Sequence, residues 1–255
     1  MSIWEILAVF AAGVGAGTIN TIVGSGTLIT FPVLLATGLP PVTATVSNAL
    51  GLIPGSISGA IGYRKELAGQ RHRILKLSVG AAVGGLTGAT LLLALPSTAF
   101  ETIVPVLVAL ALVLVILQPR ISKAVQRRRE HTGTPARPDG GPLLFTGLTL
   151  ASVYGGYFTA AQGIIYLSLM GMLVDDTLQR LNAVKNVLAA VVNSIAALFF
   201  LFVADFDWTA VVLIAVGSAI GGQIGAKVGR RLSPALLRAL IVVVGSAAIV
   251  QLLLR

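Results

Sequence analysis

A lysine and two asparagines stand close together in an apolar stretch of the second half of the chain, where an anion could bind. On a helix, Asn182 and Asn186 share one face and Lys185 lies beside them. A lysine inside a bilayer costs about 2.5–3.5 kcal/mol even on lenient insertion scales, so Lys185 should have a partner, and a bound anion could be that partner. Its position near a helix start would also let Lys185 extend its ammonium to the membrane surface. The sequence leaves both interpretations open.

The first half carries a matching polar set that has no charge. The segment Ala44–Asn48 aligns with Asn182–Asn186. Together with Asn20, the side chains of Ser47 and Asn48 offer amide and hydroxyl donors, which can hold the oxygens of an anion without a fixed charge. The alternative is that Asn20 and Asn48 only satisfy backbone groups that a break in a helix sets free.

Glycines interrupt both stretches and predict broken helices. Gly24–Gly26 reads Gly-Ser-Gly in the first half, and in the second half breaks are expected at Gly155-Gly156 and at Gly163, which follows Gln162. The N-terminal NH groups of half-helices that begin at such breaks can bind anions. Gln162, Tyr154 and Tyr157 rank lower, because tyrosines near a membrane end are commonly interface anchors. The candidate substrate-binding residues are Asn20, Gly24, Ser25, Gly26, Ser47, Asn48, Tyr157, Gln162, Gly163, Asn182, Lys185 and Asn186.

The composition is that of a membrane protein. Of 255 residues 56% are hydrophobic and 11% charged, with a mean hydropathy of +0.94, and long apolar runs recur along the chain. The net charge of +9 sits in short loops between these runs, which favours membrane topology over a nucleic-acid partner. There is no cysteine, which excludes thiolate metal sites and disulfides. No Walker A run, nucleophile triad or metal-ligand cluster stands out, so we expect neither an enzyme nor a cofactor.

The apolar runs predict the elements that position these residues. In chain order they cover residues 3 to about 35, 42–62, 77–95, 102–117, 143 to about 174, 181–203, 208–228 and 234–254. The first and fifth are too long for one straight crossing, so each either tilts strongly or folds back as two short helices. Glycines three to four residues apart, at 80–88 and 217–225, favour close contact between helices. Residues 118–142 are hydrophilic and basic and predict a flexible linker, whose start could form a short interfacial helix.

The positions of Lys and Arg favour the folded-back alternative. If 143–174 is a hairpin that returns to its own side, the loops at 64–76, 118–142 and 227–238 all lie in the cytoplasm together with Arg180. This arrangement accounts for 16 of the 18 Lys and Arg residues. Each half is then a broken or re-entrant helical hairpin plus three transmembrane helices, and the odd number of crossings inverts the second half. The predicted fold class is an all-α polytopic protein of the cytoplasmic membrane, with inverted repeats at 1–118 and 143–255 joined by a basic cytoplasmic linker at 119–142.

The paired motifs resemble those of the sulfite exporter TauE/SafE family of membrane transporters. The first-half motif is Gly17-x-x-Asn20-x-x-x-Gly24-x-Gly26, then Pro32, Gly38-x-Pro40-Pro41 and Ser47-Asn48; the second-half motif is Tyr154-Gly155-Gly156-Tyr157-Phe158, then Ala161-Gln162-Gly163 and Leu178-Gln179-Arg180-x-Asn182-Ala183-x-Lys185-Asn186. The resemblance covers essentially the whole chain. Ser25 and Thr159 stand where glycine is common in the family.

The resemblance implies a secondary transporter for a small sulfur-containing anion, such as sulfite or the organosulfonate sulfoacetate. The site would lie near the midplane between the hairpin tips, with alternating access from rocking of one repeat against the other. Two alternatives remain: a passive anion channel and a non-transporting membrane assembly factor. A coupling proton or cation and a homo-oligomer are left open. Asp175 and Asp176 are expected to form a solvated turn that caps the next helix.

Overall fold

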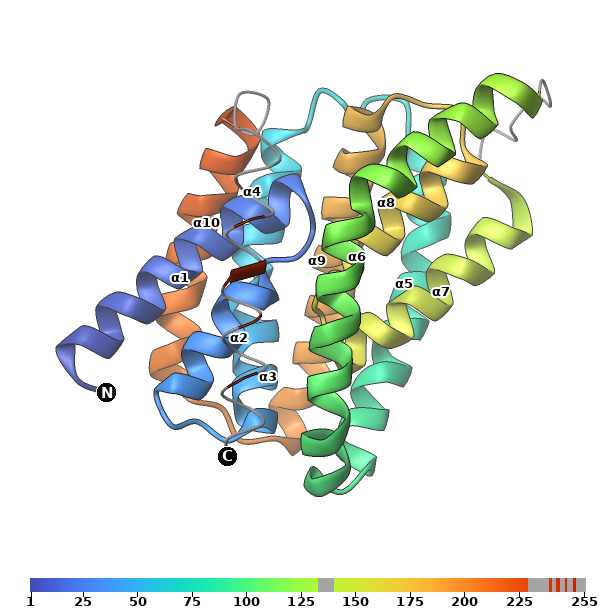
Figure 1. The fold of residues 1–255 in the computed structure, drawn as a ribbon. Coiled ribbons are helices and arrows are strands. Elements are labelled where there is room, and N and C mark those ends of the chain that lie inside the picture. The colour runs from blue at the N-terminus through green and yellow to red at the C-terminus, as the bar shows by residue number, and fades with distance from the viewer. Residues whose placement is uncertain (133–139, 229–238, 240–241, 244–245, 247–249, 251–255) are drawn as a thin grey trace.

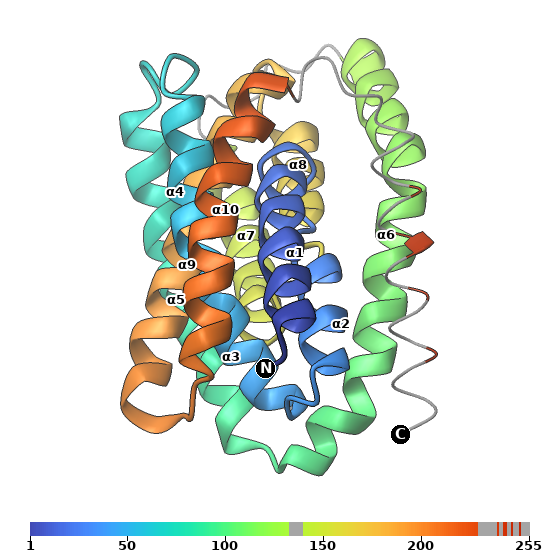
Figure 2. The same ribbon diagram turned by 90° about the vertical axis from the view of Figure 1, so that its left-hand side faces the viewer.

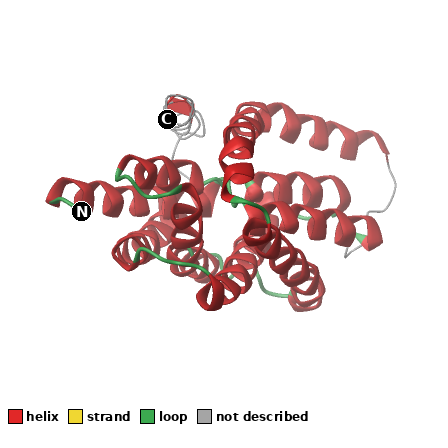
Figure 3. Ribbon diagram, turned by 90° about the horizontal axis from the view of Figure 1, so that it is seen from below, coloured by secondary structure: helices red, strands yellow, loops and turns green. Residues whose placement is uncertain are grey.

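The chain folds into a bundle of helices, and the described residues contain no strand (Figure 3). The computed structural model describes residues 1–132 and 140–228, together with isolated positions beyond 238. The helices are α1 (Ile3–Ile22), α2 (Thr27–Ala36), α3 (Pro41–Gly51), α4 (Ile53–Gly62), α5 (Arg71–Ala94), α6 (Ser97–Thr132), α7 (Gly141–Tyr157), α8 (Gln162–Leu173), α9 (Leu178–Val203) and α10 (Trp208–Val228) (Figure 1).

Five of these helices are long and apolar enough to cross a membrane. They are Ile3–Ile22, Arg71–Ala94, Thr98–Leu117 within α6, Leu178–Val203 and Trp208–Val228. Two shorter apolar helices, α2 and α8, lie between them in the chain. The prediction of an all-α, multi-pass membrane protein is therefore confirmed.

Both long apolar segments fold back, as predicted. In the first half α1 ends at Ile22 and α2 begins at Thr27, and Gly24 makes the turn with a φ of +87°. Only glycine adopts that backbone region without strain. In Figure 1 the hairpin α1–α2 opens toward the lower end of the molecule and the hairpin α7–α8 toward the upper end. Opposite openings are what an inverted repeat requires, although the relation between the whole halves stays a prediction.

The second hairpin breaks just before Gly163, as predicted, but not at Gly155 and Gly156. Gly155 and Gly156 stay within α7, and the chain leaves the helix only over Phe158–Ala161. These glycines serve close packing instead. A Cβ on Gly155 would overlap the side chain of Gln162, and one on Gly156 would overlap the backbone of Gly85.

Other boundaries also differ from the predictions. The span predicted at 42–62 is two helices, α3 and α4, because Pro54 has no NH to donate to the carbonyl of Leu50 four residues earlier. The start of the predicted linker is helical, as the sequence allowed, but it is a continuation of α6 as far as Thr132 and not a separate short helix. Residues 133–139, and nearly all of the last span predicted at 234–254, lie outside the described residues.

Each hairpin packs against a helix of the other half. α1 lies along α10 (Figure 2), and α7 lies along α5, so equivalent elements make equivalent contacts. Glycines permit both contacts, as their spacing predicts. A Cβ on Gly13 would approach the Cα of Ile214 to 3.0 Å, and one on Gly217 would approach the carbonyl oxygen of Phe10 to 2.7 Å. Across the other pair, Gly84 leaves room for the backbone of α7.

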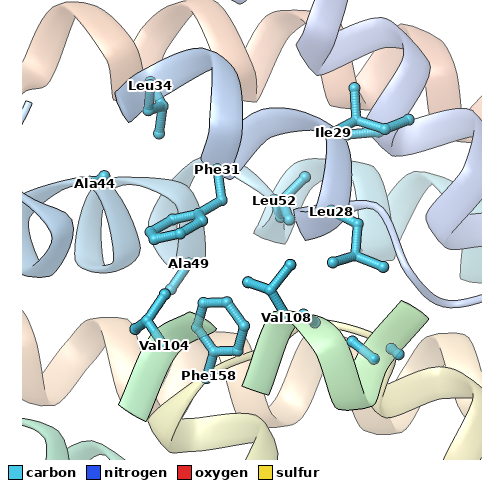
Figure 4. Packing of buried hydrophobic residues seen from close by; sticks show 14 of the residues in the cluster. Leu28, Ile29, Phe31, Leu34, Ala44, Ala49, Leu52, Val104, Val108 and Phe158 are labelled. Atoms are coloured by element: carbon cyan, nitrogen blue, oxygen red, sulfur yellow. The ribbon is translucent and has the colours of Figure 1, made fainter. Parts of the chain in front are cut away.

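A hydrophobic core lies between the first hairpin, α3, α6 and the tip of the second hairpin (Figure 4). Phe31 of α2 and Phe158 at the second tip meet edge to face, with ring centroids 5.3 Å apart and an interplanar angle of 83°. Val104 and Val108 of α6 cover these rings from the other side. The apolar core thus holds the second tip against α2, the helix that follows the first tip.

Candidate functional site

The tips of the two hairpins meet inside the bundle. The backbone NH of Gly163 donates to the carbonyl oxygen of Gly24 over 3.0 Å. Next to this contact, the hydroxyl of Thr27 donates to the hydroxyl of Thr159 over 3.0 Å. The backbones approach so closely that a Cβ on Gly163 would lie 2.5 Å from the Cα of Gly24. Two glycines that the sequence placed in separate breaks therefore form one contact.

Helix α9 caps the broken end of α1. The last carbonyls of a helix have no partner within it and form the negative end of its dipole. The Nζ of Lys185 donates to the carbonyl oxygens of Asn20 (2.8 Å) and Thr21 (3.1 Å). The amides of Asn182 and Asn186 also donate to Thr21 O, over 3.0 and 3.4 Å. A cation and two amides thus compensate the end at which α1 stops.

Lys185 does not extend to the membrane surface. Its side chain is fully buried, at 0% exposure, so that interpretation is wrong. The described residues show no ion pair to it, and its partners are backbone carbonyls. An ammonium has three NH donors, and only two have acceptors within the described part of the chain. The third has no acceptor among the described residues.

In the first half, Asn48 joins α3 to the tips. Its Oδ1 accepts the hydroxyl of Thr30 at 2.5 Å, and its Nδ2 donates to the hydroxyl of Thr27 over 3.1 Å. Because Thr27 also donates to Thr159, a chain of hydrogen bonds runs from α3 through α2 to the second tip. Asn20 takes a separate role and donates from its Nδ2 to the hydroxyl of Ser56 over 3.2 Å.

Ser47 lies away from the tips, although its position aligns with that of Lys185. Its hydroxyl accepts the backbone NH of Asp207 at 3.0 Å, in the loop before α10. Ser47 therefore faces the connection between α9 and α10, and the structure does not bring it to the other candidates. The alignment identified equivalent positions but not equivalent surroundings.

Gln162 and the tyrosines hold the second hairpin together. Gln162 donates to the hydroxyl of Tyr166, which also bonds Ser152. Tyr154 donates to the carbonyl oxygen of Ala160 over 2.7 Å, so this tyrosine braces the tip rather than anchoring at an interface. The ring of Tyr157 packs on Phe100, with centroids 5.6 Å apart.

Several buried polar atoms at the first tip and on α9 have no hydrogen-bond partner among the described residues. They are Oγ1 of Thr21, Oγ of Ser25 and Oδ1 of Asn182 and Asn186, and further along α9 Oδ1 of Asn193. Ser25 is fully buried, and Gly26 beside it leaves room for the carbonyl of Ala16. A buried polar group without a partner is costly, so a polar ligand that bonded these atoms would recover that cost.

The sequence analysis missed the threonines. Thr27 and Thr159 join the two tips, and Thr27 and Thr30 both bond Asn48, yet only Thr159 drew notice, as a departure from the family pattern. A signal existed, because Thr27 directly follows the Gly-Ser-Gly turn. The backbone acceptors of Asn20 and Thr21 had no such signal.

An ion-pair cluster ties the two halves together at one end of the bundle. Asp176 accepts Nη1 of Arg73 and Nε of Arg180, each at 2.8 Å, and Arg180 also donates to the carbonyl of Ala68. Burial alone would raise the pKa of Asp176, but the bond from Arg73, the backbone NH of Thr177 and the charge of Arg180 hold it below its ordinary value. The prediction of a solvated capping turn is wrong for Asp176, because its carboxylate is paired and Thr177 caps α9.

The described residues contain no group of three His, Asp or Glu residues that could hold a metal ion.

Comparison with known sequences gives a match over nearly the whole chain. The family model described as Sulfite exporter TauE/SafE matches residues 9–252. Among curated proteins, "Probable membrane transporter protein YfcA" of Escherichia coli (strain K12) is 27% identical over 239 residues, which are 93% of this chain and 86% of that protein. "Probable membrane transporter protein ORF9" of Sinorhizobium sp is 26% identical over 247 residues, 96% of this chain and 90% of the other. No solved structure matches significantly.

Proposed function

Because the chain belongs to the sulfite exporter TauE/SafE family, we propose that it is a secondary transporter for a small anion, sulfite or an organosulfonate such as sulfoacetate. Membership of the family, and relatives named as membrane transporters, make the chain a membrane transporter. The anion, the site and the mechanism are the parts that we add.

One feature supports this proposal most strongly: both broken hairpins end at the same buried place, beside a buried lysine. The tips meet at Gly24 and Gly163, and the ammonium of Lys185 caps the carbonyl end of α1 next to them. Discontinuous helices that meet within the bundle are the usual setting of a transporter site. A sulfur oxyanion would find there a positive charge and the free hydroxyl of Ser25.

In this proposal the contact between the tips opens and closes with transport. Rocking of one half against the other would part Thr27 from Thr159 and Gly24 from Gly163. The ion pair between Arg73 and Asp176 would have to break when the site faces the end of the bundle on which it lies. In each transport cycle, polar contacts between the halves would therefore be replaced by contacts with the anion.

Flux of labelled sulfite into proteoliposomes tests the proposal. We expect saturable flux in the wild type, a loss of about tenfold or more in Lys185→Met, and little change in Ser47→Ala. Ser47 is the matched control because it aligns with Lys185, is equally buried and lies away from the tips. Thermal unfolding in detergent must show that each variant is folded.

Three outcomes separate the proposal from its alternatives. Saturable flux that accelerates when sulfite is present on the opposite side is the signature of a carrier. Flux that rises linearly and ignores the opposite side would identify a passive channel. Absence of sulfite and sulfoacetate flux in folded wild-type protein would refute the proposed substrate and favour an assembly factor.

A further inference from the structure

The described interior holds a single residue of a charged type. Among the buried residues in the described ranges, Lys185 is the only Lys, Arg, His, Asp or Glu, and its ammonium form is the one that its two carbonyl acceptors favour. The polar residues around the tips are hydroxyls and amides, which are neutral: Thr21, Ser25, Thr27, Thr30, Asn48, Asn182 and Asn186. The carboxylate of Asp176 is partly buried, but it lies in the loop before α9 and is paired to two arginines.

The partial charges of the broken helices do not change this count. Each helix end carries roughly half an elementary charge, negative at the C-terminus and positive at the N-terminus. Two C-termini, at Ile22 and Tyr157, lie at the tips together with two N-termini, at Thr27 and Gln162. The four half-charges cancel, and the net charge at the tips is that of Lys185.

The ionisable groups on the helices that pack against α9 are at their ends or are tyrosines. α1 carries Glu5 in its first turn, far from the tip, and α5 carries Arg71, His72, Arg73 and Lys76 in its first two turns. α3 and α4 carry none, and α7 and α8 carry only tyrosines: Tyr154, Tyr157 and Tyr166. None of these adds a second cation to the site.

From this charge balance, and resting on the proposed function, we infer that the site selects anions of net charge −1. A monoanion beside Lys185 gives a neutral buried complex. A dianion leaves one negative charge buried and unpaired, and a zwitterion leaves the lysine uncompensated; both carry the desolvation cost of an unpaired buried charge. This narrows the proposed function: hydrogensulfite and sulfonates of charge −1 are the preferred substrates, and sulfoacetate, which the proposed function also names, should bind more weakly, as should sulfite dianion and sulfate.

Three two-carbon sulfonates test this inference, because they differ mainly in net charge. At neutral pH, 2-aminoethanesulfonate is neutral overall, 2-hydroxyethanesulfonate is a monoanion and sulfoacetate is a dianion. Each is added unlabelled to proteoliposomes at fixed pH, and inhibition of labelled sulfite flux gives its apparent affinity. We expect 2-hydroxyethanesulfonate to inhibit best, sulfoacetate on the order of 100-fold less well, and 2-aminoethanesulfonate at least about tenfold less well.

Variants at Lys185 show whether the preference depends on its charge. Lys185→Arg keeps a single cation, so the order of the three sulfonates should persist. Lys185→Met removes it, so the affinity for 2-hydroxyethanesulfonate should fall by about tenfold or more. Ser47→Ala should leave all three affinities unchanged, because Ser47 bonds the loop before α10.

The results distinguish failure of the inference from failure of the proposed function. Sulfite flux that sulfoacetate or 2-aminoethanesulfonate inhibits as well as 2-hydroxyethanesulfonate does would overturn the charge rule and leave the transporter intact. Sulfite flux that none of the three inhibits would also overturn it. No sulfite flux in folded protein would refute the transport proposal itself.

Discussion

At each hairpin tip a helix ends and leaves carbonyl groups that need hydrogen-bond donors, and the two tips obtain these donors in different ways. The second tip is braced from within its own hairpin, where Tyr154 donates to Ala160 O and the NH of Phe158 donates to Tyr154 O. The first tip depends on another helix, because the carbonyls of Asn20 and Thr21 find their donors on α9. The two halves therefore share an arrangement of helices, but their tips are stabilised by different hydrogen-bonding groups.

This difference explains where the charge lies. A helix end whose carbonyls are left open attracts a cation, and a tip that closes its own bonds does not need one. Lys185 thus belongs, by its contacts, to the first hairpin, although the sequence places it in the second half. Substitutions at the two tips should therefore reduce the stability of the protein by different amounts.

The largest effect should come from filling the contact between the tips. Gly24→Ala puts a side chain on a residue with φ of +87° and drives its Cβ into the backbone of Gly163. We expect a loss of about 3 kcal/mol or more, from left-handed strain and overpacking together. Gly38→Ala is the matched control, because its φ is +88° but no atom lies within 4 Å of the added Cβ. It should lose only about 1 kcal/mol. Apparent Tm in detergent measures both, and equal losses would show that the tip contact does not matter to stability.

Next in size is the removal of the cap on the first tip. Lys185→Met leaves the carbonyl of Asn20 without a donor, while Thr21 O keeps those of Asn182 and Asn186. We expect a loss of about 1–3 kcal/mol, the cost of one unsatisfied buried group. Lys227→Met, on an exposed lysine in the last turn of α10, should change stability by less than about 0.5 kcal/mol. A Lys185→Met protein as stable as the wild type would show that the carbonyl end of α1 needs no cation.

A smaller effect should follow from loosening the second tip. Tyr154→Phe deletes the hydroxyl that binds Ala160 O and should cost about 1–2 kcal/mol. Tyr157→Phe deletes a buried hydroxyl that has no partner in the described ranges and should be neutral or slightly stabilising. Chemical unfolding of the two variants side by side measures the difference. If both variants lose the same stability, the hydrogen bond from Tyr154 to Ala160 O does not stabilise the second tip.

The smallest effect concerns the outer ends of the hairpins. The first ends in a turn without an ion pair among its described residues, whereas Asp176 pairs with Arg73 and Arg180 at the end of the second. Asp176→Asn should cost about 0.5–1 kcal/mol at neutral pH. Because the folded-state pKa of Asp176 is lowered, its contribution is complete above its unfolded value of about 3.9 and is lost as the pH falls through the folded value. The stability difference from wild type, followed by Tm from pH 7 down to pH 3, should be constant at first and shrink only at the acid end. A difference that grew on acidification would contradict this sign.

Hydropathy predicted most of the fold because a bilayer imposes it. Runs of apolar residues have one stable arrangement in lipid, and the distribution of Lys and Arg favoured the folded-back hairpins that the structure contains. Boundaries were less predictable. Gly155 and Gly156 suggested a break. In a sequence, however, a glycine that lets a neighbouring segment pack closely cannot be distinguished from a glycine that ends a helix.

The site was predictable only as a set of polar residues. Asn48, Asn182, Lys185 and Asn186 stood out because polar side chains in apolar stretches are costly and few. Their partners did not, since Lys185 bonds the backbone of Asn20, 165 residues away, and any residue would supply that carbonyl. The alignment of the halves misplaced Ser47 because equivalent positions need not face equivalent neighbours.

The exchange of packing between the halves has a consequence for how the protein is made. α1 meets its long partner only when α10 exists, and the hydrogen bond from Thr18 to Gly221 O spans 203 residues of sequence. At 5–20 residues per second, the ribosome takes roughly 10–40 s to cover that distance. During this time the face of α1 that packs on α10 lacks that partner, although α2 and α4 are already made. Halves produced separately should accumulate only when both are expressed in the same cell.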